Sequence, residues 1–574
     1  MIAFLTENIA PIMFGSMVLL LLLGYPVAFS LAACGIIFGV LGIQLDLLPA
    51  SLFQAMPDRI WGVMSNDTML AIPFFTFMGL ILERSGMAED LLETVGQLFG
   101  PIRGGLAFAV VLVGAMLAAT TGVVAASVIS MGLISLPIML RYGYDKRLAS
   151  GVITASGTLA QIIPPSLVLI VMADQLGKSV GDMYKGAFVP GFVLTGLYLL
   201  YVFGVTVVRP KWAPALPPEA RTLREADGSA GLRSLGVLLV LSIASTLAFL
   251  HTSLPAAIMS FMRHDTVESL GLDEHIVLGM AAWSIIAYAC AASNHAFKLG
   301  LLSNMAERFT FVLIPPLALI FLVLGTIFLG IATPTEGGAM GASGALLMAL
   351  LRKRLDRKQL RQAMESTARL TTFVVFILIG SRLFSLAFYG VNGHLWVEHL
   401  LVNMPGGQLG FLIFVNVLIF VLAFFLDFFE LSFIVIPLLA PVAEKLGIDL
   451  IWFGVLLGIN MQTSFMHPPF GFALFFLRSV APKAVKTADI YWGAVPFVLI
   501  QIIMVALVIA FPQLVSAGLD KGPAVDLDKV QIILQDSDAP LAAESAPSES
   551  SADASAPSAE DAGNDALMRQ LGAK

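Results

Sequence analysis

The sequence predicts an all-α polytopic membrane protein built from two inverted halves. Hydrophobic residues make up 58% of the 574 residues and charged residues only 12%, which is too few charges to coat a soluble protein of this size. Apolar runs recur along the chain, as expected of membrane helices. Residues 137–165 also align without a gap to residues 441–469, and the identical positions are three prolines, one glycine and one aspartate. Because Pro and Gly shape or break helices, this match predicts a structural repeat.

The repeat and the composition divide the chain into four parts. A first half spans 1–208, a connecting region with about two added transmembrane helices spans 209–309, a second half spans 310–515, and a tail spans 516–574. The tail is rich in Ala, Ser and Pro, and residues 520–574 carry 11 acidic and 4 basic residues. Such a composition predicts disorder, because it cannot bury enough apolar surface to offset the entropy of ordering.

Each half contains a predicted re-entrant helical hairpin. Two apolar arms lie within residues 105–137 and two within residues 408–441, and each arm is too short to cross a bilayer of about 30 Å at about 1.5 Å per residue. The first pair meets at Thr120, Thr121 and Gly122, and the second meets at a tip that contains Asp427. Such tips must lie inside protein or beside a watery cavity. The alternatives are a helix kinked at one glycine in the first half and a surface loop in the second.

An interrupted helix follows each hairpin, at about residues 148–176 and 450–477. The breaks are the double prolines Pro164-Pro165 and Pro468-Pro469, which lack amide hydrogens and clash with the preceding turn. Backbone carbonyl groups are therefore freed beside clusters of hydroxyl and carboxamide side chains. These oxygens, with those of the hairpin tips, predict two cavities suited to sodium.

The residues assigned to the cation cavities are Thr120, Thr121, Gly122, Ser156, Gly157, Thr158, Asp427, Asn460, Gln462, Thr463 and Ser464. The first cavity combines the first hairpin tip with the first interrupted helix, and the second combines the second tip with the second interrupted helix. The alternative is that the Ser and Thr hydroxyl groups only form hydrogen bonds across packed helices, which is common in membranes.

Loop charges test whether the halves are inverted. The loop 141–147 carries three basic residues and one acidic residue, whereas its counterpart 444–449 carries one basic and two acidic residues. By the positive-inside rule the first loop is cytoplasmic and the second lies outside. Equivalent loops therefore lie on opposite sides of the membrane, as an inverted repeat requires.

The candidates for substrate binding are Gln161, Ser166, Arg382 and His467. Opposed helix ends near the breaks offer amide donors to a carboxylate, and the planar guanidinium of Arg382 suits the same group. His467 is either proton-linked or packed with a hydrogen bond.

The alternatives for Arg382 are a salt bridge to Asp427, Glu430 or Glu336, or a snorkelling position near the interface. Glu336 follows Pro334 and is interpreted as a cap of the helix that begins there.

The sequence contains no His-Glu-x-x-His cluster, no Gly-x-Ser-x-Gly elbow and no P-loop, which argues against a membrane enzyme and against an ATP-driven pump. We therefore expect no catalytic residues, no transition metal and no nucleic-acid partner.

From about residue 1 to 515 the sequence resembles the large membrane subunit of tripartite ATP-independent periplasmic (TRAP) transporters. The most specific segments are Ala71–Phe75 with Gly79, Ala155–Thr158 through Ile162–Ser166, Ala332–Glu336 with Gly341, and Leu446–Asp449 through Pro468-Pro469. The resemblance implies an elevator-type transporter of the ion-transporter superfamily in the bacterial inner membrane, which imports a small organic acid with sodium as coupling ion and has no other cofactor.

It also implies two protein partners within the lipid bilayer and the periplasm: a small four-helix membrane subunit and a periplasmic substrate-binding protein. The alternative is a single-component sodium- or proton-coupled anion transporter of the same superfamily. Both hairpin tips depart from the common family pattern. Thr121-Gly122-Val123 stands where Ser-Gly-Ser is frequent, and Leu426-Asp427-Phe428 stands where Leu-Asp-Pro is common.

Overall fold

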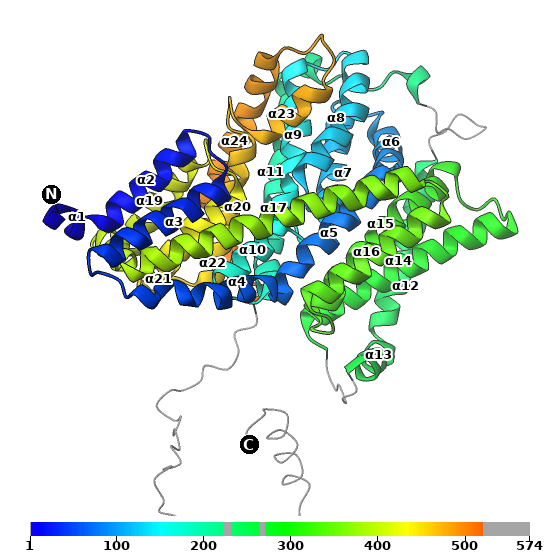
Figure 1. The fold of residues 1–574 in the computed structure, drawn as a ribbon. Coiled ribbons are helices and arrows are strands. Elements are labelled where there is room, and N and C mark those ends of the chain that lie inside the picture. The colour runs from blue at the N-terminus through cyan, green and yellow to red at the C-terminus, as the bar shows by residue number, and fades with distance from the viewer. Residues whose placement is uncertain (1, 222–230, 264–269, 520–574) are drawn as a thin grey trace, which may run out of the picture. The chain divides into compact units, whose positions relative to one another are not determined.

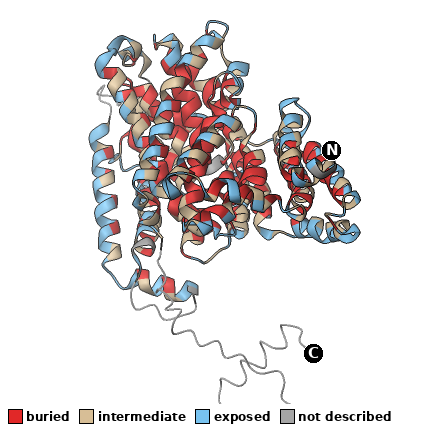
Figure 2. Cartoon of the chain, turned by 90° about the vertical axis from the view of Figure 1, so that its left-hand side faces the viewer, coloured by how far each residue is buried: buried red, intermediate tan, exposed pale blue. Residues whose placement is uncertain are grey.

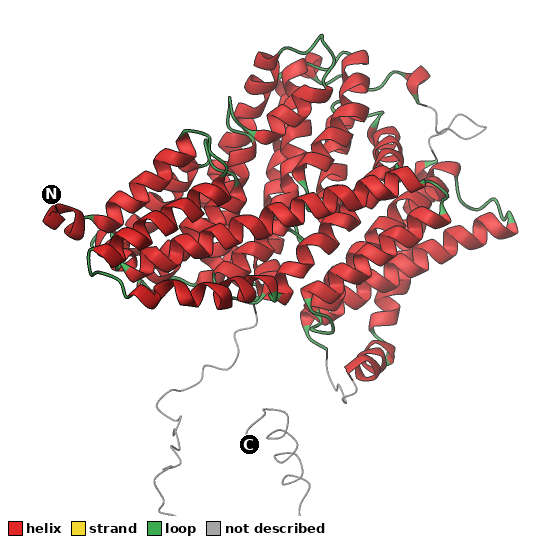
Figure 3. Ribbon diagram, viewed as in Figure 1, coloured by secondary structure: helices red, strands yellow, loops and turns green. Residues whose placement is uncertain are grey.

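The computed structural model describes residues 2–221, 231–263 and 270–519, and their regular structure is entirely helical (Figure 3). The described residues belong to one compact unit, which ends at Leu519. The tail predicted to be disordered lies, from residue 520 on, outside the described residues.

The first 208 residues form the helices α1 (Ile2–Glu7), α2 (Ile9–Leu22), α3 (Val27–Gln44), η1 (Ala50–Ala55), α4 (Met56–Met64), α5 (Asp67–Arg84), α6 (Met87–Phe99), α7 (Gly105–Thr121), α8 (Val124–Arg141), α9 (Lys146–Thr158), η2 (Leu159–Gln161), α10 (Leu167–Gln175) and α11 (Val180–Val208). The region that follows forms η3 (Pro210–Trp212), η4 (Pro218–Ala220), α12 (Leu232–Leu250), α13 (Leu254–Arg263) and α14 (Leu272–Phe297).

The rest of the body forms α15 (Asn304–Phe328), α16 (Pro334–Leu351), α17 (Arg357–Gly390), α18 (Gly393–Val402), α19 (Gly407–Leu422), α20 (Phe428–Glu430), the π-helical turn η5 (Leu431–Val435), α21 (Ile436–Lys445), α22 (Leu450–Met461), η6 (Gln462–Phe465), α23 (Phe472–Val480), α24 (Thr487–Ala510) and α25 (Gln513–Ser516) (Figure 1).

Within the described residues, eight helices are long and apolar enough to cross a membrane, or up to ten if each of two bent helix pairs is one span. The prediction of an all-α, multi-pass membrane protein is confirmed. Two of the eight, α12 and α14, lie in the connecting region, where the sequence predicts added spans. Most residues of α12 are exposed in the isolated chain, and its exposed Val and Leu side chains are those that a bilayer would cover.

The residues shared by the two halves have matching structural roles. Gly143 and Gly447 adopt left-handed backbone conformations, with φ of +81° and +71°, which glycine reaches without steric cost. Two residues later, Asp145 and Asp449 cap the N-termini of α9 and α22 by accepting hydrogen bonds from backbone amides. Each Gly-Asp pair thus ends a hairpin and begins an interrupted helix.

The interrupted helices also match. In the first, α9 runs through η2 into the break at Pro164-Pro165 and α10 follows; in the second, α22 runs through η6 into the break at Pro468-Pro469 and α23 follows. Both Pro-Pro peptide bonds are cis. The distal arm of each hairpin packs against the distal part of the other half's interrupted helix, since α8 contacts α23 while η5 and α21 contact α10. Such reciprocity is what a two-fold relation between the halves produces.

A second group of helices packs beside these elements. α17 runs across the view of Figure 1 and packs along α3, while α5 packs along α16. A Cβ atom on Gly380 would lie 2.4 Å from the carbonyl oxygen of Ala28, and one on Gly35 would lie 2.6 Å from that of Leu383. Close backbone approach through small residues is typical of membrane helix pairs. Figure 2 shows buried residues concentrated where helices pack together and exposed faces on the peripheral helices.

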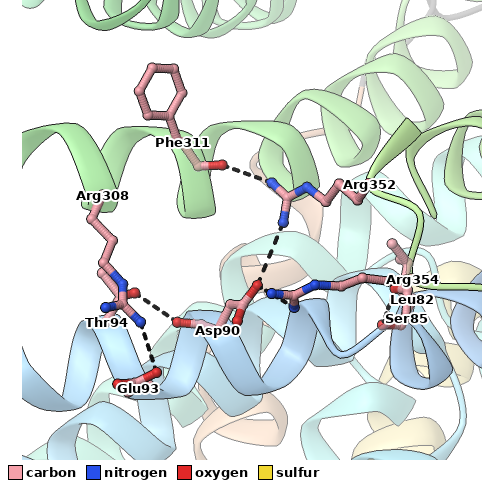
Figure 4. A network of polar contacts seen from close by, with 9 residues as sticks. All are labelled: Leu82, Ser85, Asp90, Glu93, Thr94, Arg308, Phe311, Arg352 and Arg354. Carbon is pink, nitrogen blue, oxygen red and sulfur yellow. Dashed lines mark hydrogen bonds and ion pairs between the residues drawn. The ribbon is translucent and has the colours of Figure 1, made fainter. Parts of the chain in front are cut away.

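Ion pairs join α6 to this second group. The Asp90 carboxylate lies 2.6 Å from Arg354 and 3.8 Å from Arg352, and Glu93 lies 2.8 Å from Arg308 of α15 (Figure 4). Asp90 and Arg352 are partly buried, which reduces screening of their interaction by solvent, whereas Arg354 is exposed. Because α6 leads directly into α7, the network fixes the helix from which the first hairpin begins.

We expect Asp90→Asn to lower stability, because two arginines lose their shared carboxylate. The expected loss is about 1–2 kcal/mol, or a Tm lower by about 2–4 °C in a thermal unfolding assay of the detergent-solubilised protein. Glu365→Gln is the matched control, since Glu365 pairs with Arg361 at 2.7 Å on an exposed face, and its Tm should not change. Equal Tm values for the two variants would contradict a stabilising role of the network.

Candidate functional site

The first hairpin packs closely against the first interrupted helix. A Cβ atom on Gly114 of α7 would lie 2.4 Å from Cβ of Ser156, and one on Gly157 would lie 2.3 Å from a methyl group of Val128 on α8. The three predicted cavity residues of α9, Ser156, Gly157 and Thr158, are therefore held between the two hairpin arms, and all three are buried. Glycine at 114 and 157 is what allows this approach.

The tip of the first hairpin lies against the first double-proline break. Gly122 ends α7 with φ of +58°, and a Cβ there would meet the carbonyl oxygen of Pro165 at 3.3 Å. The side chains of Thr120 and Thr121 lie outside the described part of the structure, so their assignment to a cation cavity stays a prediction.

The second hairpin tip is organised by two carboxylates. Asp427 accepts a hydrogen bond from the Glu430 amide at 2.9 Å, and Glu430 accepts one from the Asp427 amide at 3.0 Å. This reciprocal capping starts the short helix α20. Asp427 is partly buried, and a carboxylate oxygen that accepts one hydrogen bond retains lone pairs for a cation.

Asn460 of α22 is anchored to the second hairpin by a residue that the sequence analysis did not identify. Its side-chain amide donates to the backbone oxygen of Asn416 at 2.8 Å and to the Asn416 carboxamide oxygen at 2.9 Å. A polar residue within the apolar run of α19 was the signal available in the sequence.

Three hydroxyl groups of the predicted cavities, all on described residues, donate to backbone oxygens three or four residues earlier in the chain. Ser156 donates to Val152 O at 2.6 Å, and Thr463 donates to Asn460 O at 2.7 Å. Ser464 similarly donates to Met461 O at 2.6 Å. These three bonds do not cross between packed helices, whereas the hydroxyl oxygen of Thr158 does accept a hydrogen bond from another helix, from Gln501 of α24. Because each hydrogen is directed to a carbonyl group, each hydroxyl oxygen keeps lone pairs that can coordinate a cation.

The two interrupted helices meet where each begins to break. Gln462 Nε2 donates to the backbone oxygen of Thr158 at 2.9 Å, and these two residues occupy equivalent positions in the aligned halves. Direct contact between equivalent residues places the approximate two-fold axis at this point. Gln501 of α24 also reaches Thr158, with Nε2 3.4 Å from its hydroxyl oxygen. Gln501 is not among the residues predicted from the sequence, although it is a polar residue within a long apolar run.

Two of the candidate substrate residues lie together at the first break. Gln161 is 2% exposed, and within the described part of the structure neither its amide nitrogen nor its carboxamide oxygen has a hydrogen-bond partner. Ser166 donates to the backbone oxygen of Gln161 and caps the N-terminus of α10. A buried carboxamide with both ends free offers a donor and an acceptor to a polar ligand.

His467 lies at the second break among aromatic rings. Its ring stacks on Phe424 with centroids 4.2 Å apart and meets the edge of Phe420 at 4.3 Å. Neither ring nitrogen forms a hydrogen bond with a described residue. The packed position agrees with one interpretation of His467, and its hydrogen-bonded or proton-linked role stays a prediction.

Arg382 lies partly buried on α17 and forms no ion pair with any residue in the described ranges. The three carboxylates proposed as its partners act as helix caps instead; Glu336, for example, accepts a hydrogen bond from the Thr333 amide at 2.8 Å. The capping role inferred for Glu336 is thus present. The neighbouring Ser381 donates to the backbone oxygen of Phe433 at 2.6 Å, which joins α17 to the second hairpin.

An open cavity of about 420 Å³ lies beside the second hairpin tip, between α17 and the turn that joins α2 to α3. Its lining is mainly apolar and includes Phe29, Phe376, Phe425 and the carboxylate-bearing Glu430. The cavity shows that the second tip borders open space on the side of the α3–α17 pair.

Comparison with known proteins identifies the family. Residues 14–514 match the family described as "Tripartite ATP-independent periplasmic transporter, DctM component". The chain belongs to this family. The match covers both hairpins and both interrupted helices, so the resemblance inferred from the sequence is confirmed, and the protein is a TRAP large permease.

Curated relatives of this TRAP permease extend over most of its length. The C4-dicarboxylate TRAP transporter large permease protein DctM of Rhodobacter capsulatus is 27% identical over 515 residues, which cover 88% of this chain and 97% of that protein. The ectoine TRAP transporter large permease protein TeaC of Halomonas elongata is 24% identical over 512 residues, with the same two coverages of 88% and 97%. Among solved structures, the YdaH transporter of Alcanivorax borkumensis aligns with a TM-score of 0.49 at 15% identity, covering 81% of this chain and 90% of that chain.

The glycine at 114 gives a sharp test of this geometry. Replacing Gly by Ala in a helix usually stabilises it by about 0.5–1 kcal/mol, so a loss can come only from the contact with Ser156. We expect Gly114→Ala in this TRAP permease to lower the Tm, measured by thermal unfolding in detergent.

Gly196 of α11 is the control, because a Cβ there meets nothing within 4 Å. Gly196→Ala should leave the Tm unchanged or raise it. A Tm for Gly114→Ala at or above that of the parent chain would show that α7 and α9 are not packed as described.

Proposed function

We propose that this permease imports a small organic acid together with sodium ions. The observation that carries the proposal is the pair of repeat-related breaks, each of which is covered by a hairpin tip and surrounded by oxygen-bearing side chains. Sodium prefers such oxygen ligands, and broken membrane helices of this kind bind coupling ions and substrates. Uptake requires no change in the chemistry of the substrate, and we propose no enzymatic activity.

The sodium ligands proposed are those of the two cavities, on either side of the contact between Gln462 and Thr158. The first cavity uses α9 with the tip at Gly122, and the second uses α22 and η6 with Asp427. Ser156 and Thr463 contribute hydroxyl oxygens whose hydrogens already bond elsewhere. A bound ion would therefore stabilise both interrupted helices without breaking these hydrogen bonds.

The substrate position proposed is the space between the two hairpin tips. The first turn of α8 follows Val123, whose side chain does not cap it, and amides at a helix N-terminus suit an anion. Gln161 adds an unpaired donor and acceptor. Two of the curated relatives are named for C4-dicarboxylates and for ectoine, which bear carboxylates, and this supports a carboxylate-bearing substrate for this chain.

The transport cycle proposed is an elevator movement in the bacterial inner membrane. The hairpins and interrupted helices share reciprocal contacts and would move as one carrier block, while the α3–α17 and α5–α16 pairs would form the scaffold. Sodium stabilises the substrate-binding conformation of the two interrupted helices and so favours substrate binding. By linkage, bound substrate favours sodium binding to the same extent. Two partners complete the system: a small membrane subunit on the scaffold and a periplasmic binding protein that delivers the acid.

The double variant Ser156→Ala with Thr463→Ala tests the sodium ligands. We expect the half-saturating sodium concentration for uptake into proteoliposomes to rise about tenfold or more, because one ligand is lost from each cavity. Thr371→Ala is the control, since Thr371 makes a similar hydrogen bond to Thr367 O at 2.9 Å on α17. Unchanged sodium dependence of the double variant would refute the assignment.

The requirement for partners separates a tripartite system from a single-component anion transporter. Tagged protein purified in mild detergent should carry a small membrane subunit in near-equal amount, and uptake should depend on an added binding protein. Full uptake by the isolated chain would instead establish the single-component transporter.

A further inference from the structure

We infer that Gln501, held by Tyr198, couples the two cation cavities through Thr158 and Gln462. Gln501 and Tyr198 lie on α24 and α11, outside both hairpins and both interrupted helices. This inference rests on the proposed function, because it explains how sodium binding at one site affects sodium binding at the other. Gln501 is thus a positioning residue and does not itself coordinate sodium at either site.

The four residues form a continuous hydrogen-bonded chain within the core. Gln462 Nε2 donates to Thr158 O at 2.9 Å, and Gln501 Nε2 lies 3.4 Å from Thr158 Oγ1 and 2.9 Å from Tyr198 Oη. All four residues are fully buried, each with 0% exposure. Thr158 Oγ1 directs its hydrogen to Ala155 O at 2.9 Å, so its oxygen accepts from Gln501. Thr158 thus receives one glutamine on its carbonyl oxygen and another on its hydroxyl oxygen.

These bonds determine which way the amide of Gln462 points. A backbone carbonyl can only accept, so the Gln462 atom that faces Thr158 O must be the nitrogen. Its Oε1 is then directed elsewhere, and among the described residues it has no hydrogen-bond partner; the same holds for Gln501 Oε1. A buried, unpaired amide oxygen is costly unless something satisfies it. Cations and waters are the species that bind such oxygens.

Coupling follows from the two ends of each carboxamide. A sodium ion that binds near Gln462 Oε1 fixes the plane of that amide, and the same plane directs Nε2 to Thr158 of the first cavity. Gln501 donates to the hydroxyl oxygen of Thr158. This second hydrogen bond keeps Thr158 from moving with α9 alone. Ligand binding at one break therefore biases the geometry of the other, and by thermodynamic linkage the effect is reciprocal.

Sodium-dependent thermal stabilisation of the purified permease, with any subunit that co-purifies, tests the inference. Titration with NaCl at constant ionic strength, with choline as replacement, should give a Hill coefficient above 1 for the parent chain. Gln501→Met and Gln462→Met preserve side-chain volume and remove the amide. We expect both to lower the Hill coefficient to about 1 and to raise the half-saturating sodium concentration about fivefold or more.

Gln408→Met is the matched control, because Gln408 donates to Leu446 O at 2.6 Å on an exposed surface; its Hill coefficient should equal that of the parent. Tyr198→Phe removes only one oxygen from the chain of bonds and supplies the test if Gln501→Met does not fold. A Hill coefficient of 1 in the parent, or an unchanged one in the variants, would overturn the coupling. No stabilisation by sodium in the parent would instead refute the proposed sodium symport.

Discussion

The fold depends on one constraint: a helix broken within an apolar layer must have its freed backbone groups covered by protein. Each half breaks its central helix at a double proline and covers the break with its own hairpin tip. Gly122 lies against the Pro165 carbonyl in the first half, and Phe424 stacks on His467, immediately before Pro468, in the second. The close glycine contacts of α9, the Asp caps and the reciprocal packing of the hairpins all serve to hold these two covered breaks in place.

The two halves share a backbone plan but differ in the side chains that line it. At equivalent positions the first break carries Gln161, with both amide ends unpaired, and the second carries Phe465, which packs near Phe428 with centroids 6.1 Å apart. Equivalent backbone positions therefore carry a polar side chain at the first break and an aromatic side chain at the second. Thr158 and Gln462, which are also equivalent, are in direct contact, and Gln462 donates one hydrogen bond to Thr158. Divergence at these few positions therefore gives the two breaks different polar groups.

The sequence predicts the parts of this architecture that local backbone chemistry determines. Proline pairs, left-handed glycines and N-cap aspartates act within a few residues, so the breaks and the ends of the helices follow from their order alone. Contacts across the fold do not follow in this way, because apolar helices pack in many registers. Gln501 reaches Thr158 across 343 positions of sequence, and Asn460 meets Asn416 across 44. Arg382 shows that a residue can be identified from the sequence while its contacts cannot. Its charge is evident in the sequence, but the carboxylates named as its partners act as helix caps.

The distribution of unpaired polar atoms indicates where ligand binding would gain free energy. Ten buried side-chain nitrogen and oxygen atoms of the described residues lack a partner, and six of them belong to Gln161, Gln462, His467 and Gln501. Each such atom costs about 1–3 kcal/mol until it is satisfied. The hydroxyl groups of Ser156, Thr463 and Ser464 already donate to backbone oxygens nearby in the chain, so they would stay satisfied without a ligand. Under the proposed function, a ligand would therefore gain most of its binding energy from a few carboxamide atoms beside the two breaks, and its departure would leave the helices folded.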